Sequence, residues 1–360
     1  ALPIYLKNIA VIGPVADSMS ATEGSWVVFG HKPAAVTVLQ GIRAKLPAAT
    51  VTYAPGPDIR RDFPSFFEMF FPENRKSAQP PAEAEAAFHA AVAAARSADL
   101  VVMVLGEDAD MAGEAASRGS LDLPGRQEEL LKAVCALGKP VVLVLLNGRP
   151  LSINWAAQHV PAILEAWEPG TEGGNAVADI LFGDVNPGGK LPVTFPRSGS
   201  HAPMYYAHTL SHQPEGHPQY TSRYWDSPTT PLYPFGFGLS YTTFAIDNLT
   251  LSAQQVKVGE SFTVRADVTN TGSVAGDEVV QLYIHQRWGT DSRPVRELKG
   301  FARLTLQPGD TRTVDFQLGP EELRYWSTNA AAWIQDAAAF DLWIGSDSLA
   351  TLHAEFEVID

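Results

Sequence analysis

Residues 100–114 read Leu100-Val101-Val102-Met103-Val104-Leu105-Gly106-Glu107-Asp108-Ala109-Asp110-Met111-Ala112-Gly113-Glu114. The first six residues are apolar without a break, which is typical of a strand buried on both faces of a parallel sheet. The rest begins a loop of small and acidic residues that runs to Pro124, where the pattern predicts a helix. In an open α/β sheet, ligands bind beyond the carboxyl ends of the strands. This stretch therefore predicts an α/β fold with an acidic site at one edge of its sheet.

Strand and helix patterns alternate on both sides of this stretch, over residues 1–199. Such alternation favours a mostly parallel sheet with helices on its faces, an α/β sandwich. We expect further strands at residues 8–12, 51–54, 140–146 and 161–167, and helices at residues 35–46, 83–98 and 171–182. Residues 191–195 predict a short edge strand, because Pro192 suits an edge. Residues 57–80 have no clear period and predict a long surface loop.

The pattern changes to a period of two from about residue 244 to the end of the chain. Several short strands at this spacing, separated by turn residues, indicate an antiparallel β-sandwich. The strands are expected at residues 261–268, 279–284, 312–318, 340–344 and 353–358. Residues 200–243, which are rich in His, Tyr, Trp and Pro, are too aromatic for a flexible linker. We expect them to form an ordered strap between the two domains.

The composition excludes several classes of protein. A net charge of -14 argues against nucleic acid or an anionic membrane as a partner, because both require basic surfaces. No apolar run has the length of a membrane span. The single cysteine, Cys135, excludes an intrachain disulfide and a cysteine-based metal site. The histidines between residues 201 and 217 are irregularly spaced, so we expect no metal and no cofactor.

Three long motifs occur in order along the chain. They are Trp167-Glu168-Pro169-Gly170-Thr171-Glu172-Gly173-Gly174-Asn175-Ala176, Asp184-Val185-Asn186-Pro187-Gly188-Gly189-Lys190-Leu191-Pro192-Val193-Thr194-Phe195-Pro196 and Tyr233-Pro234-Phe235-Gly236-Phe237-Gly238-Leu239-Ser240-Tyr241-Thr242-Thr243-Phe244. Together they resemble the C-terminal portion of family 3 glycoside hydrolases, most closely the periplasmic β-glucosidases of bacteria. The resemblance covers essentially the whole chain. It implies a flavodoxin-like α/β sandwich followed by a fibronectin type III-like domain, in a periplasmic or secreted protein.

The resemblance also implies a division of catalytic labour. In this family an N-terminal barrel carries the nucleophilic Asp, and this sequence has no barrel, so we expect the barrel to be a missing partner. The α/β sandwich supplies the general acid/base, a Glu that precedes a short Arg-containing segment leading to Leu-Pro. Glu114 fits that position before Arg118, and Glu107 is the competitor. We favour Glu114, because a residue at a strand end is more often held in place than one further out on a loop. The alternative is that Glu114 is an ordinary solvated acid.

Roles are also expected for four other residues. Arg118 either contacts substrate or barrel, or forms a local salt bridge with Asp108, Asp110 or Asp122. Met111 is predicted to contact substrate. Glu172 and Asn175 stand where helix-capping residues are common.

The function that the resemblance implies is hydrolysis of terminal β-glucosyl residues, in oligosaccharides or aryl β-glucosides, with retention. A β-xyloside or an arabinoside is an alternative substrate, because the barrel mostly determines which sugar binds. The resemblance is also compatible with a homodimer. A non-catalytic carbohydrate-binding or scaffold module is the alternative from another class. A nucleotide-binding flavodoxin-like protein is disfavoured, since the glycines at 170, 173 and 174 lack the spacing of a phosphate loop.

Overall fold

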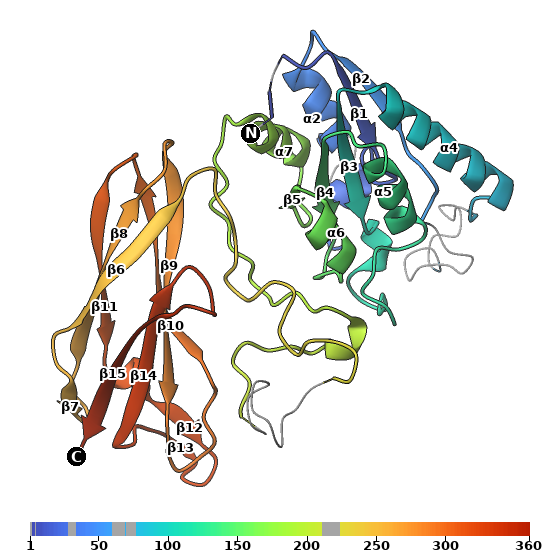
Figure 1. The fold of residues 1–360 in the computed structure, drawn as a ribbon. Helices are drawn as coiled ribbons and strands as arrows, with labels where there is room; N and C mark the ends of the chain where they lie inside the picture. The colour runs from blue at the N-terminus through green and yellow to red at the C-terminus, as the bar shows by residue number, and fades with distance from the viewer. Residues whose placement is uncertain (1, 4, 28–33, 60–68, 70–76, 211–223) are drawn as a thin grey trace. The chain divides into compact units, whose positions relative to one another are not determined.

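The computed structural model describes residues 2–3, 5–27, 34–59, 69, 77–210 and 224–360 (Figure 1). The chain divides into two compact units. The first, called here the α/β unit, contains Ala1–Val185 and Arg197–Ser200. The second, called the β-sandwich unit, contains Asn186–Pro196 and His201–Asp360. Each unit is described by itself.

The α/β unit is built on a five-stranded parallel sheet in the order β2-β1-β3-β4-β5. Its strands are β1 (Asn8–Ile12), β2 (Thr50–Ala54), β3 (Leu100–Gly106), β4 (Val141–Leu146) and β5 (Ala162–Glu165). Every residue of β3 and β4 is buried, as their apolar sequences predict. This strand order is the one found in flavodoxin-like sheets. The predicted α/β fold is therefore confirmed.

Helices cover both faces of this sheet (Figure 1). On one face, α1 (Met19–Glu23), α2 (Val38–Lys45) and α7 (Gly173–Phe182) share an apolar core with β1, β3 and β4. α4 (Pro81–Ser97) contacts β1 and β2, and α5 (Gln127–Cys135) contacts β3 and α4, with buried side chains outside that core. Shorter elements complete the unit: α6 (Asn154–His159) and the 3-10 turns η3 (Ala109–Met111) and η4 (Gly199–His201).

Two local predictions were wrong, and a third lies largely outside the described residues. The helix predicted after Pro124 is present as α5, which begins at Gln127, after Gly125 takes a left-handed turn with φ of +65°. Residues 191–195 make one isolated bridge, from Phe195 to Tyr233, rather than a strand. Glu172 makes no capping hydrogen bond at α7 and instead accepts one from Asn175. Most of residues 57–80, predicted to be a loop, lies outside the described residues.

The β-sandwich unit has the two sheets that the period-two pattern predicts. One sheet has the order β10-β9-β14-β15-β7, the other β11-β8-β6, and β12-β13 is a separate hairpin. The strands are β6 (Phe244–Leu251), β7 (Gln255–Lys257), β8 (Phe262–Asn270), β9 (Gly276–Gln286), β10 (Glu297–Leu306), β11 (Thr311–Leu318), β12 (Tyr325–Ser327), β13 (Ala332–Ile334), β14 (Ala338–Gly345) and β15 (Leu352–Ile359), with the short helix α8 (Pro320–Leu323). Alternate residues of β8, β11 and β14 point into a shared apolar core. The predicted strands left out β6 and β10, and also the three-residue strands β7, β12 and β13.

Two of the three quoted motifs hold the β-sandwich unit together. Asn186 accepts hydrogen bonds from the Ser240 hydroxyl and the Tyr241 amide, both at 2.8 Å. Its own amide donates to the carbonyl of Ala275 at 2.8 Å. Lys190 forms an ion pair with the buried Glu278, 3.1 Å long. These motif residues thus stabilise the β-sandwich unit.

Candidate active site

The acidic loop, residues 107–122, leaves the carboxyl end of β3 beside the carboxyl end of β1. These neighbouring strands are followed by connections that diverge, to β2 on one side and to β4 on the other. Such a switch in strand order opens a crevice where ligands bind in α/β sheets. The loops after β1 and β3 are joined there, because the Ser20 hydroxyl donates to Asp108 (3.0 Å) and the Ser25 hydroxyl to the carbonyl of Ala109 (2.9 Å).

Gly106 makes the departure from β3 possible. Its φ is +139°, and a Cβ at this position would lie 1.8 Å from the carbonyl oxygen of Leu146 on β4. No side chain fits in that space. Gln127, the first residue of α5, is buried and binds the Gly106 backbone twice, at 2.9 and 2.7 Å. The strand end is thus fixed, and the chain turns into the loop at Glu107.

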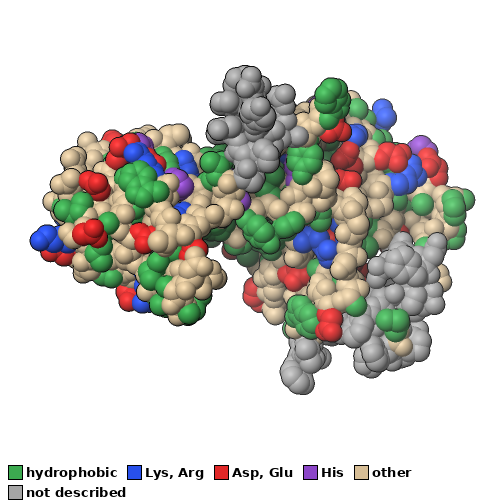
Figure 2. Space-filling view, turned by 90° about the horizontal axis from the view of Figure 1, so that it is seen from below, with side chains coloured by type: hydrophobic (Ala, Val, Ile, Leu, Met, Phe, Trp, Pro, Cys, Tyr) green, Lys and Arg blue, Asp and Glu red, His purple; other side chains and the backbone are tan. Residues whose placement is uncertain are grey.

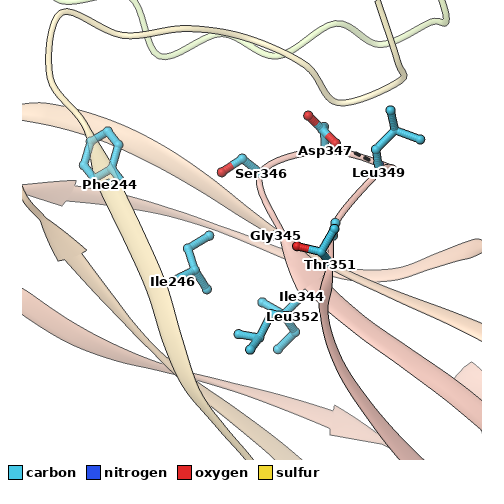
Figure 3. A pocket seen from close by; sticks show the side chains of 10 residues that line it. Phe244, Ile246, Ile344, Gly345, Ser346, Asp347, Leu349, Thr351 and Leu352 are labelled. Atoms are coloured by element: carbon cyan, nitrogen blue, oxygen red, sulfur yellow. Dashed lines mark hydrogen bonds between the residues drawn. The ribbon is translucent and has the colours of Figure 1, made fainter.

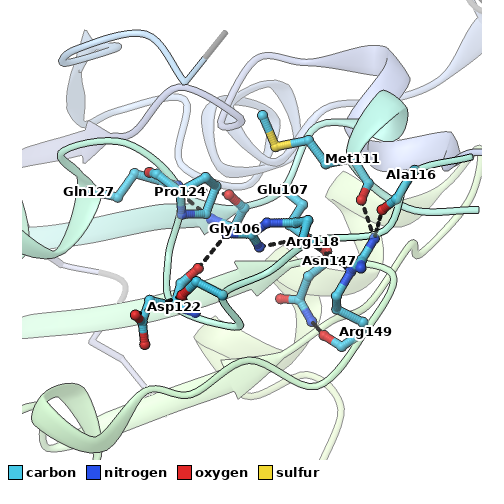
Figure 4. Close-up of polar contacts among 11 residues, drawn as sticks. Gly106, Glu107, Met111, Ala116, Arg118, Asp122, Pro124, Gln127, Asn147 and Arg149 are labelled. Carbon is cyan, nitrogen blue, oxygen red and sulfur yellow. Dashed lines mark hydrogen bonds and ion pairs between the residues drawn. The ribbon is translucent and has the colours of Figure 1, made fainter. Parts of the chain in front are cut away.

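Glu107 is buried, with 2% of its surface exposed, and two arginines bind it (Figure 4). Arg118 Nη1 lies 2.6 Å from Glu107 Oε1, and Arg149 Nε lies 3.1 Å from the same oxygen and 3.2 Å from Oε2. A buried carboxylate requires such compensation, because desolvation of an unpaired charge is costly. Glu107 is held in place, as expected for a strand end: its backbone amide donates to the carbonyl of Leu146 at 2.8 Å, and the two arginines bind its carboxylate.

The same two arginines also bind backbone carbonyls of the acidic loop (Figure 4). Arg149 Nη2 donates to the carbonyl of Met111 and, at 2.8 Å, to that of Ala116. Arg118 Nη2 donates to the carbonyl of Asp122 at 2.7 Å. The loop is therefore closed on itself around a buried ionic centre.

Glu114 stands at the apex of the closed loop. It is exposed, and it makes no hydrogen bond or ion pair with any residue that the structure describes. The next residue, Ala115, has a φ of +56°, a left-handed conformation that costs a non-glycine residue about 1–2 kcal/mol. Backbone strain of this kind is concentrated at functional sites. The apex presents one carboxyl group toward solvent from a rigid support.

Trp26 lies beside the apex. A Cβ on Gly113 would lie 3.2 Å from the indole Nε1 of Trp26 and 3.2 Å from the Cβ of Ser25. Gly113, with φ of +90°, thus brings the backbone next to the indole ring, and 60% of the Trp26 surface is exposed. An exposed indole next to a free carboxyl group provides an apolar face for a ligand.

A second acid, Glu165, lies at the same edge of the sheet, at the end of β5. Its Oε1 accepts hydrogen bonds from the Trp167 amide (3.0 Å) and the Asn147 side chain (3.1 Å). Its Oε2 is buried and has no partner among the described residues. Burial, with a smaller contribution from the nearby charge of Glu107, raises the pKa of Glu165 to about 8. Burial thus favours the protonated form of Glu165.

The predicted site residues have different environments. Arg118 forms its ion pair with Glu107, whereas Asp108, Asp110 and Asp122 were the predicted partners; Asp122 contributes its backbone carbonyl. Met111 is half-buried and packs against the core of the α/β unit. Contact of Met111 and Arg118 with substrate stays a prediction.

Sequence analysis missed Arg149, Glu165 and Trp26. The first two could have been recognised from the order of the predicted strands, because they lie near strand ends that meet. β3, β4 and β5 pair in parallel, with Leu145 opposite both Leu105 and Glu165, so polar residues that end each strand meet. Trp26 follows α1 and gave no signal, because nothing in the sequence relates it to Gly113.

Three residues of the β-sandwich unit, Asp341, His353 and Glu355, place ligand atoms within 4.8 Å of one another, as a metal site requires. However, Arg287 forms ion pairs with both Asp341 and Glu355. Hydrogen bonds from Arg287, and then from His353, lower the pKa of Asp341. The guanidinium therefore supplies the positive charge that this cluster attracts. Of the histidines considered above, His212 and His217 lie outside the described residues.

A shallow pocket of about 290 Å³ occurs in the β-sandwich unit, between β6 and the loop after β14 (Figure 3). Phe244, Ile246 and Leu352 provide apolar lining. Its one carboxyl group, Asp347, accepts a hydrogen bond from the Leu349 amide at 2.7 Å. That carboxyl group is thus bound within its own loop, and the lining contains none of the site residues that the sequence predicts.

The surface seen in Figure 2 has Lys and Arg side chains scattered among Asp and Glu, without a continuous basic area on that face. A nucleic-acid-binding surface needs clustered positive charge. No described helix has the length and apolar character to span a bilayer.

Comparison with known proteins identifies the family. Residues 1–241 match the glycosyl hydrolase family 3 C-terminal domain, and residues 278–348 match the fibronectin type III-like domain. A periplasmic beta-glucosidase from Salmonella typhimurium is 43% identical over 98% of this chain and 46% of its own length. A beta-xylosidase from Formosa agariphila is 40% identical over 96% of this chain and 45% of its own.

A solved structure shows the same fold. The beta-glucosidase from Listeria innocua in complex with isofagomine has a TM-score of 0.85 and 34% identity, over 98% of this chain and 46% of that protein. The chain thus spans about half the length of the relatives it matches. It belongs to glycoside hydrolase family 3, of which it contains the C-terminal α/β domain and the fibronectin type III-like domain.

Proposed function

We propose that this chain supplies the general acid/base, Glu114, to a retaining β-glucosidase whose nucleophile comes from an N-terminal domain. The observation that carries the proposal is the contrast along the acidic loop. Glu107 is buried between two arginines, whereas Glu114 is exposed at an apex that the same arginines hold. A group that exchanges protons with a substrate must be accessible and positioned.

The chemistry runs in two steps. A nucleophilic carboxylate of the N-terminal domain attacks the anomeric carbon while Glu114 gives its proton to the departing glycosidic oxygen. The covalent glycosyl-enzyme is then hydrolysed, with the Glu114 carboxylate taking a proton from the attacking water. A general acid must hold its proton near neutral pH, a state that burial favours. The proposal therefore requires the N-terminal domain to cover the exposed apex.

The substrate is a terminal β-glucosyl residue of an oligosaccharide or an aryl β-glucoside. Support comes from the Salmonella relative, which is named a periplasmic beta-glucosidase, and from the Listeria enzyme, for which complexes with glucose and laminaribiose are described. The exposed ring of Trp26 offers a face on which a sugar or aglycone stacks. A periplasmic or secreted location is proposed on the same relative.

A β-xylosidase is the second candidate, because the Formosa beta-xylosidase is nearly as similar to this chain. A xyloside lacks the exocyclic CH₂OH of a glucoside. A site that binds this group discriminates strongly, since its polar partners are left unpaired by the smaller sugar.

Fusion to an N-terminal segment tests the proposal. The segment of the Salmonella enzyme that this chain does not match is joined ahead of residue 1, and the fusion is assayed on nitrophenyl β-glucoside and β-xyloside. We expect glucosidase activity in the fusion and its loss in the Glu114→Gln fusion. Glu128→Gln, a surface change on α5 at an exposed ion pair with Lys132, is the matched control. Full activity of the Glu114→Gln fusion contradicts the proposal, and preference for the xyloside selects the second candidate.

A further inference from the structure

Three parallel strands bring two acids and an amide together behind the acidic loop. Glu107 follows β3, Asn147 follows β4, and Glu165 ends β5. Because Leu145 is opposite both Leu105 and Glu165, these strand ends are adjacent. Glu107 has its two arginines, but Glu165 has no cation bound to it among the described residues.

Asn147 and Glu165 form half of an acid–amide pair. The Asn147 side-chain NH₂ donates to Glu165 Oε1 at 3.1 Å. Asn147 Oδ1 and Glu165 Oε2 are both buried, and both lack a partner within the described residues. A neutral carboxylic acid pairs with a primary amide through two hydrogen bonds, N–H to oxygen and O–H to oxygen. The second hydrogen bond of such a pair joins the two atoms that lack partners here. Glu165 Oε2, once it carries a proton, donates to Asn147 Oδ1.

The pair is joined to the acidic loop through Arg149. The second N–H of the Asn147 side chain donates to the backbone carbonyl of Arg149 at 2.9 Å. The guanidinium of Arg149 in turn binds the carbonyls of Met111 and Ala116, which lie on either side of Glu114. A continuous series of hydrogen bonds thus runs from Glu165 to the two ends of the apex.

We propose that Glu165 is a positioning residue for Glu114: as a neutral acid paired with Asn147, it holds Arg149 where Arg149 fixes the acidic loop. The proposal deepens the proposed function, because it assigns what places the general acid/base. The loop's dependence on Glu165 is a property of this chain and does not require catalysis.

The charges around Glu165 support its neutral state. Burial raises the pKa of Glu165 to about 8, and the charge of Glu107 adds to this effect. The other charged groups of this edge are Arg118 and Arg149, both bound to Glu107, and Glu168, which accepts hydrogen bonds from Ser25. Loss of the proton adds a second negative charge next to Glu107. That charge competes for Arg149 and withdraws it from the loop carbonyls.

Nuclear magnetic resonance of the 360-residue chain tests the proposal. The amide signals of Ala112 and Ala116 report the loop, because both lie next to the apex. In the wild type we expect these signals to shift with a midpoint near pH 8. Glu165→Gln keeps the amide pairing but cannot ionise, so its loop signals are expected to match the wild type at pH 6 and to stay constant to pH 9.

Two further variants make the result specific. Glu165→Leu removes the pairing and is expected to displace the loop signals already at pH 6. Glu83→Gln, an exposed acid of α4, is the control and is expected to retain the wild-type transition. A wild-type loop that shows no transition, or the same transition in Glu165→Gln, overturns the proposal. If Glu165→Leu does not fold, the Glu165→Gln comparison still decides. None of these results depends on activity, so the role of Glu114 is judged separately.

Discussion

The base and the apex of the acidic loop each carry a glutamate, and the two environments are opposite. At the base, Glu107 is buried and binds Arg118 and Arg149. At the apex, Glu114 is exposed and forms no hydrogen bond or ion pair with a described residue. A buried acid bound by arginines can thus hold a loop on which a second acid stays exposed. The charge of Glu107 is paired with the two arginines that hold the loop, and Glu114 lies exposed on that loop.

The contrast predicts different effects for substitutions at the base and at the apex of the loop. Changes at the base should lower the stability of the α/β unit, because they leave buried groups without partners. Changes at the apex should leave stability intact and affect chemistry. Four substitutions test whether stability and chemistry depend on different parts of the loop.

The largest effect is expected for Glu114→Gln in the fusion with the N-terminal segment. Loss of a general acid/base lowers kcat/KM by about 10²–10⁴-fold. The loss should be greatest for a phenyl glucoside and least for a dinitrophenyl glucoside, whose leaving group departs without a proton. The free energy of unfolding of the chain should change by less than about 0.5 kcal/mol. An equal loss for both leaving groups breaks the assignment.

Glu107→Gln is expected to have the next largest effect, on stability. It leaves Arg118 and Arg149 without a counter-charge, and breaking a buried ion pair in this way costs about 3–5 kcal/mol. Urea denaturation followed by circular dichroism measures the loss, with helix signal that comes mainly from the α/β unit. The exposed pair of Glu128 gives a control, where Glu128→Gln should cost less than about 0.5 kcal/mol. A cost below about 1 kcal/mol at Glu107 shows that the base is not the anchor.

Glu165→Gln should change the dependence of stability on pH. The pKa of Glu165 is raised from 4.5 to about 8, so the folded chain keeps a proton that the unfolded chain releases between these values. The Glu165 carboxyl therefore lowers the free energy of unfolding progressively as pH rises from 4.5 to 8. It has no effect on this free energy below pH 4.5. At about 1.4 kcal/mol for each pKa unit between 4.5 and 8, the variant should be more stable than wild type by about 4–5 kcal/mol at pH 8. At pH 4 the two should be equal, and a difference independent of pH contradicts this account.

The smallest effect is expected for Gly113→Ala. An alanine at a φ of +90° is strained, and its Cβ lies 3.2 Å from both Ser25 and Trp26. We expect a loss of about 1–2 kcal/mol in the free energy of unfolding. Activity of the fusion should fall more than this loss explains, because Trp26 and the apex move apart. Gly138→Ala, at a φ of +68° with nothing near its Cβ, separates strain from crowding.

The sequence predicts the fold well, because the fold depends on local apolar patterns. Fully apolar runs correctly placed β3 and β4, and period two correctly placed β8 and β11. Residues 191–195 misled because their apolar alternation has no continuous partner strand: Phe195 bridges Tyr233, and Leu191 hydrogen-bonds to Gly236 and Phe237. β10 was missed because Lys299 and Gly300 interrupt its pattern, at a place where its register shifts.

The site was predicted only in part, because it depends on contacts that are distant in sequence. The acidic loop and both candidate glutamates were visible in one stretch. Arg149, which holds the loop, lies 42 residues from Glu107, and the ion pair between them follows from the adjacency of β3 and β4. The protonated state of Glu165 depends on burial, which no motif encodes.

The most direct test of the role of Glu114 uses azide. In the fusion carrying Glu114→Ala, dinitrophenyl β-glucoside should form the glycosyl-enzyme, but its hydrolysis should stall because no base activates water. Azide attacks without a general base, so turnover should recover with azide concentration and release β-glucosyl azide. The wild type and the Glu128→Gln control should release glucose instead. No azide-dependent recovery in Glu114→Ala, or recovery in Glu107→Ala in its place, would contradict the account.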